Sequence, residues 1–155
     1  VGKIKPVNRN VVIIGGGRIG CEMADFLLEN NNHITIIEQQ KYLAINMEKK
    51  NRRDLMNRLL NRKVKRIANA KVIEIKNSEV ILLNGQNRIE SVYADHIVLA
   101  TGLIPDNDLY REIQNRHRNV FIIGDAFAVK GLKNALLQGE MVCEQINHLC
   151  RINGH

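Results

Sequence analysis

Aromatic and cysteine residues are scarce in this sequence of 155 residues. It has no Trp, three Phe and three Tyr, and its three cysteines (Cys21, Cys143 and Cys150) have no CxxC spacing. Such cysteines argue against a disulfide framework and a zinc site, and they fit a reducing compartment. We therefore expect a cytoplasmic protein without a metal centre.

Long apolar runs are also missing. No stretch approaches the roughly 18 apolar residues that span a bilayer, and the first residues lack the apolar core of a signal peptide. The overall apolar content is nevertheless 45%, which is typical of globular proteins. We expect a chain that buries a real core and has no membrane partner.

The charge balance is basic, with a formal net charge of +7. Nine Lys and Arg residues lie between Lys49 and Arg66, around a predicted helix. A cluster of this kind can bind nucleic acid, but the aromatic residues on which single-stranded bases stack are missing. We interpret the cluster as a solvated basic face that could also meet an acidic neighbouring domain, and we expect no nucleic-acid partner.

The most informative stretch runs from Val11 to Glu38. An apolar run over 11–14 leads into GGGRIG at 15–20, a helical pattern follows, and a second apolar run over 34–37 ends at the acid. Strand, glycine turn, helix, strand and acid in this order form the layout of a dinucleotide-binding βαβ unit. A glycine-rich turn in an α/β protein that holds no nucleotide is the alternative, and the ordered context argues against it.

The glycines of this turn have separate physical roles. Gly15 permits the tight turn, Gly17 lets a diphosphate approach the backbone, and Gly20 lets helix and strand pack closely. Amides at the start of the helix favour the negative phosphates. Glu38 lies 18 positions after Gly20, near the spacing of about 20 at which an acid binds the adenine ribose. Because a carboxylate repels a 2′-phosphate, we predict that NAD(H) binds here.

The neighbouring residues complete the candidate site. Gly16 and Ile19 belong to the glycine motif, and Arg18 could reach the diphosphate, although a solvated Arg in a first helical turn explains it as well. Cys21 lies near a helix N-terminus, where a thiol pKa can fall. Since no Cys or His is close in sequence, we interpret Cys21 as a small packing residue.

Periodicity predicts the surrounding α/β elements. We expect residues 39–47 to cross the carboxyl edge of the sheet, a second helix over 48–60 and a third strand near 64–67. The predicted inner face of the first helix consists of Ile19, Met23, Phe26 and Leu27. The predicted apolar stripe of the second helix consists of Leu55, Met56, Leu59 and Leu60.

From Lys71 the rhythm changes to short strand-like runs over 72–75, 80–83 and 88–93, with a hairpin signal at Asn84-Gly85. These runs predict an antiparallel meander in place of a crossover helix, followed by a buried strand over 96–100. The predicted fold class is therefore α/β, a Rossmann-like doubly wound parallel sheet with an antiparallel β-meander crossover.

The C-terminal third continues the pattern. Asp106 could cap a short helix to about Gln114, with Leu109 and Ile113 facing inward. A buried strand over 120–123 precedes Gly124-Asp125-Ala126, and a last helix covers about 132–149. We predict that Leu132, Ala135, Leu136, Val142 and Ile146 share one face of that helix.

These residues resemble a known family. Residues 15–24, GGGRIGCEMA, resemble the GGGxxGxExA signature of the nicotinamide domain in flavoproteins with two dinucleotide-binding domains. The resemblance implies that Glu22 lies near the nicotinamide. Residues 100–105, ATGLIP, resemble the ATGxxP that closes this domain and includes Gly102. Residues 121–126 are similar to a stretch that lies against the flavin, which implies a flavin contact for Asp125.

Within the pyridine nucleotide-disulfide/flavin oxidoreductase superfamily, the sequence is most similar to the C-terminal part of NADH:flavin oxidoreductases related to 2-enoate reductase and 2,4-dienoyl-CoA reductase. The lack of periodicity over 1–10 predicts a linker. The resemblance implies an NAD-binding domain over 11–103 and, over 104–155, the closing strand and helix of an FAD domain. The earlier GxGxxG of family members and their redox CxxxxC are not found. We thus expect a fragment that positions NADH for hydride transfer to FAD, with the missing FAD-domain portion as partner and no assigned catalytic residue.

Two other functions fit the same residues. A single-domain FAD-binding module would use both the glycine turn and the Gly124-Asp125 segment. A non-catalytic nucleotide-sensing or interaction domain would use the fold without turnover. An apolar surface left uncovered by a missing domain could also pair two copies as a homodimer.

Overall fold

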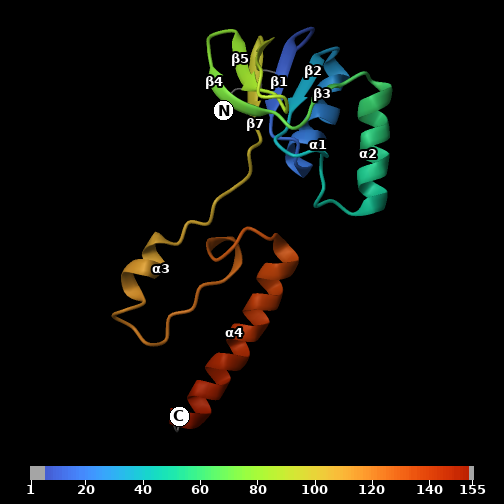
Figure 1. Ribbon diagram of the computed structural model, residues 1–155. Coiled ribbons are helices and arrows are strands. Elements are labelled where there is room, and N and C mark those ends of the chain that lie inside the picture. The colour runs from blue at the N-terminus through green and yellow to red at the C-terminus, as the bar shows by residue number, and fades with distance from the viewer. Residues whose placement is uncertain (1–5, 154–155) are drawn as a thin grey trace. The chain divides into compact units, whose positions relative to one another are not determined.

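The structure is a computed structural model, and it describes residues 6–153. The chain divides into two compact units between Gly102 and Leu103, and Figure 1 shows an α/β unit followed by a second unit made mainly of helix. Among residues 6–153, no helix is both long enough and apolar enough to cross a membrane. Each unit is described in turn.

A parallel sheet of four strands forms the centre of the first unit. The strands are β1 (Asn10–Ile14), β2 (His33–Ile37), β3 (Lys65–Ile67) and β7 (His96–Leu99), in the spatial order β3-β2-β1-β7. β1 pairs with β2 from Asn10↔His33 to Ile14↔Ile37 and is flanked by β7 on its other side. The runs of Val and Ile suit strands that are covered on both faces.

Helices cover one face of this sheet (Figure 1). α1 (Arg18–Leu27) continues into the 3-10 turn η1 (Leu28–Asn30), and α2 (Lys49–Asn61) packs beside α1. The core under them joins Val11, Ile13, Ile34 and Ile36 to helix residues that include Ala24, Leu27, Leu55 and Leu59. The predicted βαβ order, with its crossover segment, is therefore confirmed.

The predicted inner face of α1 is partly wrong. Ile19 and Phe26 are exposed, at 61% and 44%, and Met23 is half-buried. The residues that pack inward are Gly20, Cys21, Ala24 and Leu27. Small side chains make the contact because the helix lies close to the sheet. On α2, Leu60 is likewise 74% exposed and does not belong to the buried stripe.

An antiparallel meander covers the opposite face of the sheet. It consists of β4 (Lys71–Ile75), β5 (Glu79–Leu83) and β6 (Ile89–Tyr93), in that spatial order. Val80 and Leu82 of β5 are fully buried and join Val12, Ile14 and Ile37 of the parallel sheet in a second core cluster. The predicted fold class, including the meander, is confirmed.

The strand β7 is less buried than its sequence predicts. Its outer residues His96 and Leu99 are exposed and its central residues are half-buried. β7 lies at the edge of the sheet and pairs only with β1 among the described strands. The apolar run therefore indicates a strand that needs cover, and the described residues of the first unit do not provide it.

The second unit contains α3 (Asp108–Ile113), the 3-10 turn η2 (Gly124–Ala126) and α4 (Leu132–Asn153). Two predictions fail here. Residues 120–123 form no strand, because they pair with no other strand of the described chain. Asp106 does not cap α3: the N-cap residue is Asn107, and it makes no side-chain capping hydrogen bond.

The second unit also lacks a buried core over residues 103–151, where every side chain is half-buried or exposed. Leu109, which was expected to face inward, is 69% exposed. On the predicted apolar face of α4, Leu132, Leu136 and Ile146 are exposed, at 77%, 65% and 42%. The amphipathic pattern of this helix is therefore real, but the described residues of the second unit do not cover its apolar face.

Candidate functional site

The first and last glycines of the motif allow three elements to meet. Gly15 has a φ of +102°, and a Cβ at this residue would lie 2.3 Å from the carbonyl oxygen of Ala100, which follows β7. A Cβ at Gly20 would lie 2.0 Å from the carbonyl oxygen of Gly15. Both positions therefore exclude any side chain, and β1, α1 and the end of β7 converge at one turn.

The backbone N–H and the carbonyl of Gly16 both form hydrogen bonds within the protein. Its N–H donates to Glu38 Oε2 at 2.6 Å, and its carbonyl accepts from the Ala44 N–H at 2.7 Å. A Cβ at Gly16 would lie 2.2 Å from a methyl carbon of Leu43. Gly16 is thus required by the crossover segment that passes over it.

Gly17 differs from the other three glycines. It is the N-cap residue of α1, and a Cβ built on it would meet no atom within 4 Å. The face of the turn above Gly17 is therefore open. At this point the amides of the first helical turn and the positive end of the helix dipole are directed toward solvent, which is the arrangement that binds phosphate.

Glu38 lies beside this open face. One carboxylate oxygen accepts from the Gly16 N–H, and the other accepts from the Gln40 N–H at 2.8 Å. The Glu38 backbone links the ends of β2 and β3, since its N–H donates to Ile67 and its carbonyl accepts from Ala70. The side chain is therefore fixed at the carboxyl edge and directed toward the glycine turn.

The crossover segment after Glu38 is held in place by residues whose role the sequence does not reveal. Leu43 and Ala44 are buried, and Ala44 has a φ of +47°. Arg52 of α2 donates through Nε to the Leu43 carbonyl at 2.8 Å. The sequence alone does not indicate that Ala44 adopts a positive φ or that Arg52, within a basic run, is half-buried against this segment.

Arg18 and Glu22 form an ion pair on the first turns of α1. Arg18 Nε lies 2.8 Å from Glu22 Oε1, and the two side chains are 70% and 46% exposed. Arg18 is the first helical residue, directly after Gly17. Ile19, which follows, is exposed to solvent rather than packed on the sheet.

Cys21 lies beneath the turn, and its Sγ donates to the Gly16 carbonyl at 3.3 Å. Burial, followed by the charge of Glu38, raises the pKa of the thiol to about 11. These effects exceed the opposing influence of Arg52. The thiol is therefore protonated at neutral pH and acts as a small packing group, as the sequence indicates.

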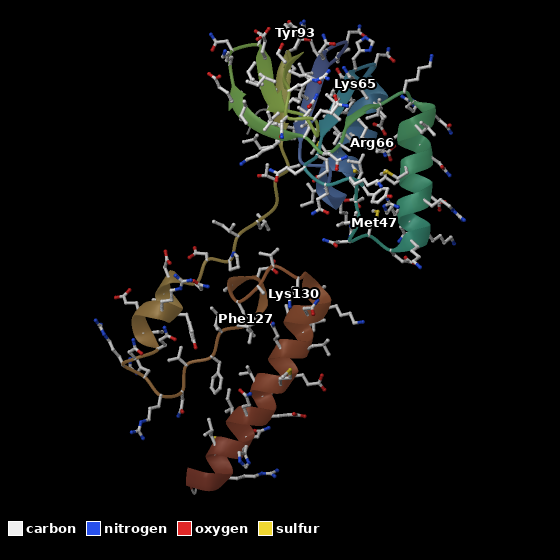
Figure 2. The ribbon with its side chains drawn as sticks, viewed as in Figure 1. Met47, Lys65, Arg66, Tyr93, Phe127 and Lys130 are labelled. Carbon is white, nitrogen blue, oxygen red and sulfur yellow. The ribbon has the colours of Figure 1, made fainter. Side chains whose placement is uncertain are left out.

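Two hollows lie along the carboxyl edge of the sheet, and a third lies between α1 and α2. One of about 90 Å³ covers the open turn and is lined by Gly17, Arg18 and Glu38. A second, of about 350 Å³, lies on the meander side of Glu38 and includes Ile75 and Leu99. The third, of about 380 Å³, separates the first turns of α1 and α2, where Met47 is labelled in Figure 2.

A larger hollow of about 650 Å³ lies at the opposite, amino edge of the sheet. It is lined by Arg62 and Lys63, and Arg62 donates to the Leu28 carbonyl at the end of α1. Because α1 and α2 both end here, their dipoles disfavour an anion. Size therefore does not locate the phosphate site, and the carboxyl edge is the better candidate.

The remaining predicted site residues are Gly102, the last residue of the first unit, and Asp125, which belongs to the second unit. Gly102 has a φ of +97°, and a Cβ built on it would meet no atom within 4 Å apart from its chain neighbours. Asp125 is an exposed residue of η2 in the second unit. The Gly124 N–H beside it donates to Gln138 Oε1 of α4 at 2.7 Å.

No group of His, Cys, Asp and Glu within the described part of the chain is arranged to hold a metal ion. Most cations of the predicted basic face are exposed, including Lys65 and Arg66 on β3 (Figure 2). On a short edge strand such charges also discourage pairing with another chain.

A comparison with protein-family models decides the family. The model described as pyridine nucleotide-disulphide oxidoreductase matches residues 2–139. The chain belongs to this family. Its curated relatives include an NADH oxidase of Thermoanaerobacter brockii, 32% identical over 140 residues, a match that covers 90% of this chain and 22% of the relative. A cinnamate reductase of Clostridium sporogenes is 30% identical over 146 residues, with 92% and 22% covered.

Solved structures of the same superfamily share the fold. A 2-naphthoyl-CoA reductase complex superposes with a TM-score of 0.73 at 25% identity, covering 89% of this chain and 21% of that one. A thioredoxin reductase of T. acidophilum gives a TM-score of 0.59 at 24% identity, with 68% and 35% covered. The predicted superfamily is thus confirmed, and the chain spans about a fifth of the length of the curated relatives it matches.

Proposed function

We propose that this chain is the NADH-binding part of a flavin-dependent oxidoreductase. The observation that carries the proposal is the pairing of an open Gly17 with the Glu38 carboxylate, which is held 2.6 Å from the Gly16 N–H. A diphosphate above Gly17 would accept hydrogen bonds from the amides at the start of α1, while Glu38 would accept them from the adenine ribose.

The Glu38 carboxylate can keep its two backbone hydrogen bonds and still accept hydrogen bonds from the ribose. Each oxygen already accepts one backbone N–H, from Gly16 and from Gln40. An ionised carboxylate has about four lone-pair positions, so acceptor sites remain for the ribose hydroxyls. The two backbone bonds fix the direction of these sites before a ligand arrives, which reduces the cost of ordering them on binding.

The hollow of about 350 Å³ beside Glu38 is suited to the adenine ring. Its lining combines Val72, Ile75 and Leu99 with polar groups at the ends of β1 and β2. Apolar side chains accept the faces of a flat ring, and the few polar groups fix its orientation. The meander thereby contributes directly to cofactor binding in this proposal.

In the parent enzyme, NADH bound to this chain would supply a hydride for FAD to accept. The residues of this chain bind and orient the dinucleotide, and we assign none of them as a general acid, base or nucleophile. By the resemblance, Asp125 of the second unit would contact the flavin, Glu22 would lie near the nicotinamide, and Gly102 of the ATGxxP that closes the domain would bind the cofactor. These three roles stay predictions.

The uncovered apolar face of the second unit supports a partner. Leu132 and Leu136 on α4 are 77% and 65% exposed, and residues 103–151 contain no buried side chain. Most of the stability of an amphipathic helix comes from packing its apolar face against another surface. We propose that the missing FAD-domain portion covers it; a homodimer, a cytoplasmic location and the fragment status stay predictions.

Titration of the Glu38→Gln variant with NADH and NADPH tests the proposal. Gln retains a carbonyl acceptor for one backbone N–H but removes the charge. We expect NADH affinity to fall about tenfold, the effect of losing a hydrogen bond to a charged group, while NADPH affinity holds or rises. Glu29→Gln, on the exposed turn η1, is the matched control. An unchanged ratio of NADH to NADPH affinity would exclude the ribose role of Glu38.

A second candidate is FAD binding, because the glycine turn and Glu38 would contact only the ADP moiety, which NADH and FAD share. Purified protein that carries flavin absorbance would favour this function. Displacement of that flavin by excess NADH would show that both ligands use the same turn. A sensor without turnover would bind NADH and give no diaphorase activity once supplied with the missing portion.

A further inference from the structure

The first residue of α1 breaks a local rule of helix stability. Arg18 occupies the position directly after the N-cap Gly17, and the first turn contains no acid. The helix dipole favours anions at this end and disfavours cations. Arg18 therefore weakens the isolated helix, although the same charge would strengthen the binding of an anion above Gly17. Departures from local rules of this kind are typical of functional positions.

Glu22 neutralises this cation one turn later. The pair uses Arg18 Nε at 2.8 Å, and the order of a cation followed by an acid is the weaker of the two orders on a helix. Both side chains are exposed, so Arg18 can readily leave Glu22 to pair with another anion. A guanidinium has five N–H donors, and one contact with Glu22 does not exhaust them.

The neighbouring hollows indicate where the Arg18–Glu22 pair lies. Arg18 lines both the hollow at the glycine turn and the hollow between α1 and α2. Glu22 lines only the second of these hollows. The ion pair therefore holds the guanidinium at the hollow between α1 and α2, which both side chains line.

In place of the nicotinamide contact that the resemblance implies, we propose that Glu22 is a positioning residue that competes with the dinucleotide diphosphate for Arg18. This inference rests on the proposed function and refines it. In the free protein, Glu22 holds the guanidinium over the hollow between α1 and α2. A bound diphosphate takes the guanidinium from Glu22, so that part of its binding free energy is spent on breaking the ion pair. Glu22 therefore weakens the binding of every ligand with a diphosphate at this turn, and it acts through Arg18.

The experiment is a double-mutant cycle followed by calorimetric titration of the full chain. NADH and ADP-ribose are titrated into the wild type, Glu22→Gln, Arg18→Gln and the double variant, because ADP-ribose has the diphosphate without the nicotinamide. Glu74→Gln is the matched control, since it removes an exposed acid 3.6 Å from Lys76 on the meander. Each variant is also melted thermally to show that the fold is intact.

We expect Glu22→Gln to tighten both ligands about two- to fivefold, the scale of an exposed ion pair with added repulsion from the phosphates. Arg18→Gln should weaken both about tenfold, and the double variant should match Arg18→Gln within about twofold. The gain from Glu22→Gln should disappear in about 0.5 M NaCl because salt screens exposed charges. Glu74→Gln should bind like the wild type.

Three results would overturn the inference. NADH binding weakened by Glu22→Gln with ADP-ribose unaffected would show that Glu22 touches the nicotinamide. An equal gain from Glu22→Gln with and without Arg18 would show that Glu22 does not act through Arg18. A gain that persists at high salt would indicate a change of structure. If the folded wild type binds neither ligand, the proposed function itself fails, and the inference fails with it.

Discussion

Replacing Gly17 by Ala separates ligand binding from folding at the glycine turn. The new methyl group would meet no protein atom within 4 Å, and the residue has a φ of −67°, which any L-residue adopts. Ala is a poorer N-cap residue than Gly, so we expect a loss of stability of at most about 1 kcal/mol. The methyl group does, however, stand in the space where we place the diphosphate.

Replacing Gly20 by Ala should, in contrast, cause a large loss of stability. Its methyl group would lie 2.0 Å from the Gly15 carbonyl oxygen, so the turn or the helix must move. Overpacking against side chains costs typically about 1–3 kcal/mol, and here the obstacle is backbone. We expect a loss of about 3 kcal/mol or more, which lowers the melting temperature of a unit of this size by more than about 10 °C.

Affinity and stability are measured on both variants by calorimetric titration with NADH and by thermal unfolding. Displacing the diphosphate removes at least one charge-assisted hydrogen bond, worth about 1.5–3 kcal/mol, so Gly17→Ala should weaken NADH binding by about ten- to a hundredfold. Wild-type affinity in a folded Gly17→Ala protein would refute the placement of the diphosphate. A stable Gly20→Ala protein would refute the packing argument.

Other predictions concern the residues around this turn. Leu43→Ala should destabilise the protein by about 2–4 kcal/mol in a urea titration, because Leu43 is 3% exposed and packs over Gly16. Cys21 should react with a thiol reagent at pH 8 only after unfolding, since its pKa is about 11, whereas the exposed Cys143 should react in the native protein. Backbone and side-chain hydrogen bonds from Asn10 and Tyr93 lower the pKa of Asp95 below 3.8. Its stabilising contribution is therefore complete above about pH 5 and is lost as the pH falls through the lowered value, so the difference in melting temperature between wild type and Asp95→Ala should shrink on acidification.

The sequence predicts the βαβ unit and the meander because both depend on local signals. Apolar runs, the glycine turn and Asn84-Gly85 each act within a few residues, and the corresponding strands are present. The inner face of α1 is mispredicted for a physical reason. Close packing selects Gly20, Cys21 and Ala24, and residues this small contribute little to a hydrophobic pattern that is dominated by Ile19 and Phe26.

Residues 120–123 show a second limit. A run of Val, Phe and Ile indicates a segment that needs burial between neighbouring strands. It does not show that those strands are present. In the described chain no strand pairs with this run, and the apolar face of α4 is uncovered for the same reason. At the candidate site, the acid and the glycines could be found from spacing. The contacts of Leu43 and Arg52 with the turn could not, because they arise only once α2 packs beside α1.

The use of Gly16 by the crossover segment has a consequence for redesign of cofactor preference. An exchange aimed at NADPH would replace the acid after the second strand, which repels a 2′-phosphate, together with the loop that follows it. Here that loop is interlocked with the glycine turn, since the Leu43 methyl fills the notch left by the absent Gly16 side chain. A replacement loop would therefore need an apolar side chain that fills the space over Gly16. Without one, the exchange would distort the glycine turn as well as alter the cofactor preference.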